Sequence, residues 1–158
     1  MADVLVLVEQ VDGKLKKVTA ELLTAAKALG EPAAVVVGAP GTTDAVAEQL
    51  KAAGAAKIYR AESADADAHL VTPKVGVLAE LAESQGAAAI LTAATFEGKE
   101  VAGRVAARLG SGLIADAIAF GPGGTATHSI FGGAFTVEAT AGGDTPVASL
   151  RPGAVEAD

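Results

Sequence analysis

The side chains best placed to bind a ligand are two glutamates and a lysine that follow apolar, strand-like runs. Glu9 comes directly after the first such run, and Glu97 and Lys99 lie in residues 92–99, which follow the run at 88–91. In an open α/β sheet a ligand binds beyond the carboxyl ends of the strands, and a phosphate there needs hydrogen-bond donors. The two carboxylates would repel a phosphate, and Lys99 is the one compensating cation. We therefore expect no tight binding of AMP or ATP, and we interpret Lys99 as a solvated lysine in a first helical turn.

The other candidate groups do not form a catalytic or metal-binding constellation. The sequence has two histidines, His69 and His128, and no cysteine, which leaves too few ligands for a zinc site of the usual kind. Two acidic pairs have the spacing of an acid and a base, but no nucleophile accompanies them. We interpret them as solvated charges, and we expect no catalytic residue, no metal site and no enzymatic activity in this chain. The acidic pairs are Asp65 with Asp67 and Glu80 with Glu83.

Arg104 and Arg108 form a basic pair four residues apart, and Glu100 precedes Arg104 by one helical turn. This spacing predicts an ion pair between Glu100 and Arg104 on the surface of a helix. The plain interpretation is a solvated helix face. A contact with a partner protein is the alternative, because arginine is favoured at interfaces.

The elements that must position these residues are alternating strands and helices. The run at 4–8 is continuous in Val and Leu, as in a parallel strand covered on both faces, whereas Val101, Val105 and Leu109 line one face of a helix that ends at Gly110. Such alternation predicts an α/β fold with a doubly wound, mostly parallel, Rossmann-like sheet. The commonest arrangement places the first and fourth strands side by side. The expected strands are 4–8, 33–37, 57–59 and 88–91, and the expected helices are 18–29, 42–53, 72–81 and 101–109.

Two of these helices carry start signals. Thr42 or Thr43 is expected to cap the second helix, and Thr72 followed by Pro73 is expected to begin the third. With the first and fourth strands adjacent, the candidate crevice lies between residues 9–10 and the loop at 92–99.

The pattern changes after residue 120 to short segments separated by glycine pairs, which is typical of an antiparallel β-meander. Residues 125–131, 134–140 and 146–151 are expected to form three antiparallel strands, with Gly132 and Gly133 as a two-residue turn. The alternative is a glycine bulge within one long strand. Such a small sheet has an open edge that a partner chain can pair with. It also carries Phe131 and Phe135, two of the five aromatic residues; we expect one ring to point inward and the other outward.

Composition bounds the class of protein. With 158 residues, 51% of them hydrophobic, the chain can bury one substantial core. The net charge of −7 opposes binding to nucleic acid or to anionic membranes. The absence of cysteine fits a reducing compartment, and Asp3 stands where a secretory signal would carry positive charge, so we expect a cytoplasmic protein without membrane insertion.

Five segments together carry a resemblance to a known family. They are Val4-Leu-Val-Leu-Val-Glu9, Gly98-Lys-Glu-Val-Ala-Gly-Arg-Val-Ala-Ala-Arg-Leu109, Gly112-Leu-Ile-Ala-Asp116, His128-Ser-Ile-Phe-Gly-Gly-Ala-Phe135 and Leu150-Arg-Pro152. In order and spacing the chain resembles the N-terminal domain of the electron transfer flavoprotein alpha subunit. The resemblance implies a Rossmann-like domain without nucleotide, at residues 1–151, followed by the start of a linker at 152–158. It also implies that the FAD-binding C-terminal domain of the alpha subunit is absent from this sequence.

The same resemblance implies the partners. The alpha domain would pair pseudosymmetrically with an electron transfer flavoprotein beta subunit that carries AMP. The parent complex would take electrons from acyl-CoA dehydrogenases of fatty acid beta-oxidation, or from other dehydrogenases, through FAD. The small antiparallel sheet would lie at the subunit interface, or pair with itself in the isolated chain. The expected interface residues are His128, Ser129, Ile130, Phe131, Gly132, Gly133, Ala134, Phe135 and Arg151.

The sequence departs from the family pattern at His128-Ser129, where Arg-Pro is frequent, and at Ala134, where Asn is frequent. Hydrogen bonds of the family's side chains are therefore not transferred to these positions. The alternative function is a free-standing adenine-nucleotide-binding module of the universal-stress or ATP-pyrophosphatase type. That module would require a Ser-Gly-Gly type of turn after the first strand, where this chain has residues 10–13, Gln-Val-Asp-Gly. A purely structural pairing domain is a third interpretation, and it is compatible with the family resemblance.

Overall fold

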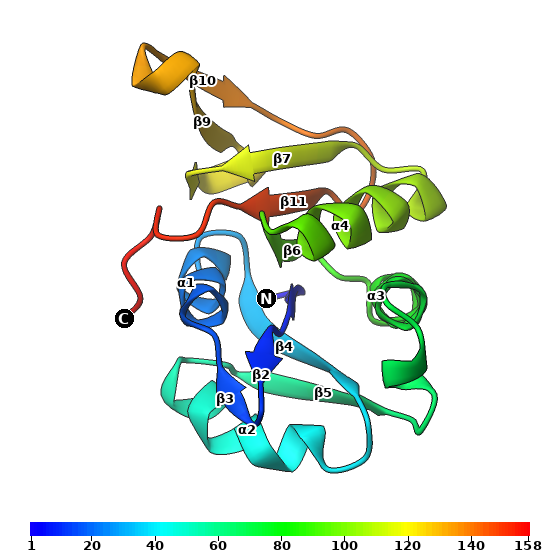
Figure 1. The fold of residues 1–158 in the computed structure, drawn as a ribbon. Helices are drawn as coiled ribbons and strands as arrows, with labels where there is room; N and C mark the ends of the chain where they lie inside the picture. The colour runs from blue at the N-terminus through cyan, green and yellow to red at the C-terminus, as the bar shows by residue number, and fades with distance from the viewer.

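A six-stranded sheet forms the centre of the fold, and the computed structural model describes all residues from 1 to 158 (Figure 1). Its strands are β1 (Asp3–Leu7), β4 (Glu31–Gly38), β5 (Lys57–Glu62), β6 (Ala89–Ala93), β7 (Leu113–Ala117) and β11 (Val147–Leu150). They lie in the order β5-β4-β1-β6-β11-β7, and every neighbouring pair is parallel. β1 pairs with β6, which confirms that the first and fourth predicted strands are neighbours.

Helices cover both faces of this sheet, and Figure 1 shows them on its two sides. They are α1 (Lys17–Ala26), α2 (Thr42–Ala52), α3 (Thr72–Gln85) and α4 (Phe96–Leu109). Alternate side chains of β1 point to opposite faces: Val4 and Val6 join the cluster formed with α1 and α2, whereas Leu5 and Leu7 join the cluster formed with α3 and α4. The doubly wound parallel architecture predicted from the sequence is confirmed.

The third helix begins at Thr72 followed by Pro73, as predicted, but the groups that cap the second and third helices differ from the prediction. The N-cap of α2 is Gly41, with φ of +93°, and the carboxylate of Glu62 accepts hydrogen bonds from the amides of Gly41 (3.1 Å) and Thr43 (2.7 Å). A side chain from the neighbouring strand β5 therefore does what Thr42 or Thr43 was expected to do. In α3 the N-cap is Val71, and Thr72 already belongs to the helix without capping it.

A second, three-stranded antiparallel sheet projects beyond the β7 edge of the main sheet (Figure 1). Its strands are β8 (Ala119–Phe120), β9 (Ala126–Ile130) and β10 (Phe135–Ala139), in the order β10-β9-β8. The prediction that residues 146–151 form the third strand of this sheet was wrong. They form β11, which is fully buried and inserts parallel between β6 and β7, and β8 takes the third place.

The connection between β9 and β10 is also longer than predicted. Ile130 pairs with Phe135, so residues 131–134 make the turn, with the short 3₁₀ helix η3 (Phe131–Gly133) inside it. The prediction of a two-residue Gly132-Gly133 turn was wrong because Phe131 shares the left-handed conformation, with φ of +52°. The remaining short elements are β2 (Gln10–Val11), β3 (Lys14–Leu15), η1 (Ala66–Ala68) and η2 (Pro122–Gly124).

Residues 152–158 contain no helix or strand and run along α1. The amide of Gly153 donates to the buried carboxylate of Glu21 at 2.8 Å, and Lys27 pairs with Asp158 at 2.6 Å. The end of the described chain is therefore held against the first helix, while the assignment of 152–158 to a linker stays a prediction.

Candidate partner interface

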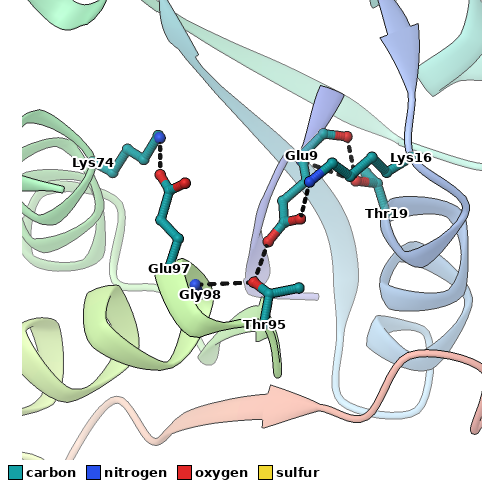
Figure 2. A network of polar contacts seen from close by, with 7 residues as sticks. All are labelled: Glu9, Lys16, Thr19, Lys74, Thr95, Glu97 and Gly98. Carbon is teal, nitrogen blue, oxygen red and sulfur yellow. Dashed lines mark hydrogen bonds and ion pairs between the residues drawn. The ribbon is translucent and has the colours of Figure 1, made fainter. Parts of the chain in front are cut away.

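The predicted crevice beyond β1 and β6 is lined by the protein's own polar side chains, several of which Figure 2 shows. Glu9 lies at its centre: one carboxylate oxygen accepts a hydrogen bond from the Thr95 hydroxyl at 2.7 Å, and the other lies 3.0 Å from the Lys16 ammonium. The Thr19 hydroxyl accepts from the Glu9 amide at 2.9 Å and donates to the Glu9 carbonyl at 3.0 Å. The Glu9 side chain is only 13% exposed, so its charge is compensated within the chain.

The N-terminus of α4, the usual place for an anion in such a fold, is occupied in the same way. The Thr95 hydroxyl caps the helix by accepting a hydrogen bond from the Gly98 amide at 3.1 Å. Glu97, in the first turn, forms an ion pair with Lys74 from α3 (Figure 2). A carboxylate in this position is favoured by the helix dipole. The amides and the positive dipole end of α4 are therefore already compensated by the Thr95 hydroxyl and the Glu97 carboxylate of the same chain.

The cations that compensate the two glutamates differ from the predicted one. Lys16 and Lys74 line the crevice together with Glu9 and Glu97, whereas Lys99 does not line it. The prediction that Lys99 is the one compensating cation was wrong. Lys16 precedes α1 and Lys74 lies in α3, so both reach the crevice from elements distant in sequence from the loop at 92–99.

These residues do not fit the phosphates of AMP, ATP or FAD. Both lysines are already paired with carboxylates, and the hydroxyl that caps α4 is bound to Glu9. A phosphate would have to displace these ion pairs and accept the repulsion of two carboxylates. The geometry supports the expectation of weak nucleotide binding, and we place no reaction step in this crevice.

The β9–β10 hairpin carries the exposed apolar side chains that the sequence pointed to. Phe131 is 79% exposed and Phe135 is 60% exposed, and their rings pack edge to face with centroids 5.7 Å apart. The prediction that one ring points inward was wrong: the hairpin tip projects beyond the main sheet, so no core lies behind either ring. Ile130 and Val137 are also exposed, which extends the apolar surface along both strands.

β10 is the outer strand of its sheet, and four of its five residues are exposed, with the fifth half-buried. Its outward backbone donors and acceptors are therefore available to another strand. We call the exposed side chains of Ile130, Phe131, Phe135 and Val137, together with the free edge of β10, the hairpin surface.

Arg151 directly follows β11 and connects β7 to the part of β9 next to the turn. Its guanidinium binds the Asp116 carboxylate through Nε (3.2 Å to each oxygen) and Nη2 (2.7 Å), and Nη2 also donates to the Ser129 carbonyl at 3.0 Å. The hydrogen bonds from Arg151 hold the pKa of Asp116 below its ordinary value. The pair is therefore charged on both sides at neutral pH.

The structure brings the predicted interface residues into one region, although not all in one role. Ser129 offers its backbone to Arg151, His128 pairs across the hairpin with Val137, and Gly132 takes the positive φ of the turn. Asp116 and Val137 were missed as members of this region. Asp116 stood in one of the matching segments, but no local pattern showed that it meets Arg151.

The remaining sequence predictions concern the rest of the surface. Arg104 and Glu100 form the predicted ion pair, at 2.6 Å, and both side chains are about half exposed, as on a solvated helix face. Phe96, at the start of α4, is fully exposed, and sequence reasoning did not single it out. No three His, Asp or Glu side chains lie together as a metal site would require, and none of the helices is both long and apolar enough to cross a bilayer.

Comparison with known proteins assigns the fold to a family. A sequence profile described as "Electron transfer flavoprotein domain" matches residues 4–158. The chain belongs to the electron transfer flavoprotein family. The "Electron transfer flavoprotein subunit alpha" of Mycobacterium tuberculosis (strain ATCC 25618 / H37Rv) is 65% identical over 158 residues, which cover 100% of this chain and 50% of that protein.

Two further relatives with the same description extend the comparison. The protein of Mycobacterium leprae (strain TN) is 62% identical over 157 residues, covering 99% of this chain and 49% of the relative. The protein of Syntrophomonas wolfei is 34% identical over 160 residues, covering 99% of this chain and 50% of the relative. The chain spans about half the length of the curated relatives it matches, and it corresponds to the N-terminal domain of an electron transfer flavoprotein alpha subunit. This family consists of electron carriers rather than catalytic enzymes.

Proposed function

We propose that this chain is the structural and subunit-pairing domain of an electron transfer flavoprotein alpha subunit, and that it docks the beta subunit through the hairpin surface. The observation that carries the proposal is the pair of exposed phenylalanine rings, Phe131 and Phe135, which pack edge to face at the tip of a projecting hairpin. Isolated apolar residues are common on surfaces, but a continuous apolar patch in a chain with few aromatic residues is typical of a protein interface.

The gain from covering these rings is large enough to matter for association. Complete burial of one phenylalanine contributes about 1.5–3 kcal/mol. With Phe131 79% and Phe135 60% exposed, covering both rings offers about 3 kcal/mol, or about a hundredfold in affinity. The free edge of β10 adds main-chain hydrogen bonds if the beta subunit contributes a strand. Aromatic anchors beside a free strand edge are a combination that gives both affinity and register.

The redox chemistry belongs to the parent heterodimer in this proposal. Flavin supplies electron acceptance and donation when it is bound, and the crevice of this chain does not fit it, so we assign FAD to other parts of the heterodimer and AMP to the beta subunit. Acyl-CoA or other dehydrogenases would deliver electrons to that complex. The present domain would contribute a rigid sheet and the docking surface.

Hydrogen–deuterium exchange of the chain, alone and mixed with the beta subunit, tests this proposal. We expect slower exchange on mixing for the amides of residues 126–139 and no change for the amides at the start of α4. The same comparison at increasing concentrations of the chain alone detects self-pairing through β10. Protection confined to the crevice, with the hairpin unaffected, would refute the proposed docking surface.

A further inference from the structure

The junction between the two sheets has an unusual backbone. Ile114 of β7 pairs with Ala148 of β11, and Ala117 pairs with Leu150, so two residues of β7 lie opposite the single residue Ser149. This is a β-bulge, a feature that bends a strand and redirects a side chain. It lies directly before the chain leaves the main sheet for β8 and the hairpin.

Asp116 is the second residue of this bulge and has φ of +59°, a value that few residues other than glycine adopt. Its amide donates to the hydroxyl of Ser149, which is fully buried, at 2.9 Å. Backbone conformations of this kind persist only where the surroundings fix them, and they concentrate at functional sites. The bulge presents the Asp116 carboxylate to the end of β11.

Arg151 uses that carboxylate to reach the hairpin. Its own amide donates to the carbonyl of Ala117 at 2.8 Å, which fixes its backbone beside β7. Its guanidinium is held on Asp116 by both Nε and Nη2, and Nη2 also binds the carbonyl of Ser129, two residues before the exposed ring of Phe131. A bidentate arginine–carboxylate pair has a defined geometry, so the direction of the third bond is defined as well.

We infer that Asp116 and Arg151 act as a clamp that sets the position of the hairpin for docking, with Arg151 a positioning residue rather than a direct contact. The inference rests on the proposed function, because the docking surface is the hairpin surface. Both side chains are about 40% exposed, so the pair adds little to global stability. Its contribution is to present β9 and β10 in one orientation before the partner arrives, which reduces the entropic cost of binding.

The alternative is that Arg151 binds an acidic group of the partner directly. The two roles predict opposite effects of changing Asp116. If Arg151 were a direct contact, removing the competing Asp116 carboxylate would leave its guanidinium free for the partner, and binding would be unchanged or tighter. If Arg151 is part of a clamp, removing Asp116 weakens binding even though Asp116 need not touch the partner.

Calorimetric titration of the beta subunit into four variants separates these roles. The variants are Asp116→Asn, Arg151→Gln, Arg151→Lys and the double variant Asp116→Asn with Arg151→Gln. Asparagine is suitable because it tolerates positive φ and so removes the charge without straining the bulge. We expect each single change to weaken binding about fivefold, and the double variant to be no weaker than about fivefold, because both changes break one pair. Arg151→Lys should weaken binding as much as Arg151→Gln does, since lysine keeps the charge but cannot bridge the Asp116 carboxylate and the Ser129 carbonyl.

Hydrogen exchange supplies a readout that separates positioning from general destabilisation. In each variant the amides of β9 and β10 should exchange faster while those of β1 and β4 remain unchanged. Uniformly faster exchange would overturn the inference, and so would wild-type affinity in Asp116→Asn or in Arg151→Lys. Phe131→Asp, titrated in parallel, distinguishes the two levels of failure. If it binds normally the docking proposal fails and the clamp with it, whereas if it binds weakly while Asp116→Asn binds normally, the clamp alone fails.

Discussion

Gly98, in the first turn of α4, offers a test of how tightly this helix is seated on the sheet. A Cβ built on Gly98 would lie 2.0 Å from the carbonyl oxygen of Ala93 and 3.0 Å from its carbonyl carbon. Both atoms belong to the backbone of β6, so no side chain can rotate away to make room. In Gly98→Ala the helix must therefore move, and the movement disturbs the Thr95 cap and the hydrogen bond from Thr95 to Glu9.

The size of the effect follows from two opposing contributions. Forcing a methyl group into a packed region costs about 1–3 kcal/mol, and a backbone obstacle favours the upper value. Replacing glycine by alanine within a helix returns about 1 kcal/mol. The net loss of unfolding free energy is about 2 kcal/mol, which in a domain of this size lowers Tm by about 4–8 °C.

Gly103 is the matched control, because it lies in the same helix and a Cβ there would meet no atom within 4 Å. Gly103→Ala should raise the unfolding free energy by about 0.5–1 kcal/mol, since only the helix propensity changes. Thermal unfolding followed by circular dichroism measures both variants under the same conditions. Shifts of Tm in the same direction for the two variants would refute the argument, because it predicts opposite signs.

Two further predictions concern charge. Contacts with Thr43 and the amide of Gly41 hold the pKa of Glu62 at about 2, below its ordinary value of 4.5. Because this pKa is depressed on folding, the carboxylate stabilises the fold fully above pH 4.5 and progressively less as the pH falls toward 2. Glu62→Gln should thus lower Tm by a few degrees at pH 7 and hardly at pH 2, and an equal loss at both would contradict the assignment. In calorimetry, AMP and ATP should bind this chain more weakly than about 1 mM; a micromolar constant that is lost on Lys16→Ala would show that the crevice is a nucleotide site.

The parallel part of the fold was predictable because its signals are local. The apolar run at β1 and the four-residue recurrence of Val101, Val105 and Leu109 in α4 each report burial of one element. The adjacency of β1 and β6 followed from the usual winding of such sheets. None of these steps required knowledge of contacts between distant side chains.

The fate of residues 146–151 was not predictable from their neighbours. Glycine pairs before this segment indicate a turn, but a turn does not specify which strand the chain pairs with next. The continuous burial of β11 marks a strand covered on both faces, which is typical of the centre of a parallel sheet rather than of a small meander. The insertion of β11 between β6 and β7 therefore depends on packing of the whole core and not on the local sequence.

The candidate site also has features that the local sequence predicts and features that depend on tertiary contacts. Phe131 and Phe135 could be singled out because aromatic residues are few, but their orientation depended on how far the hairpin projects from the main sheet. The clamp between Asp116 and Arg151, which are 35 residues apart, and the pairing of Lys74 with Glu97 depend on tertiary contacts that no periodicity reports.

The central claim is that the hairpin surface docks the beta subunit. The most direct test is to measure the affinity of the beta subunit for variants of this chain in which exposed phenylalanines are replaced. The double variant Phe131→Asp with Phe135→Asp should weaken binding about a hundredfold, because it removes about 3 kcal/mol of apolar burial. Its Tm should change little, since both rings are mostly exposed. Phe96→Asp is the control, because Phe96 is fully exposed at the start of α4, outside the hairpin. Weak binding by the double variant and normal binding by Phe96→Asp is the predicted result, and normal binding by the double variant would contradict the account.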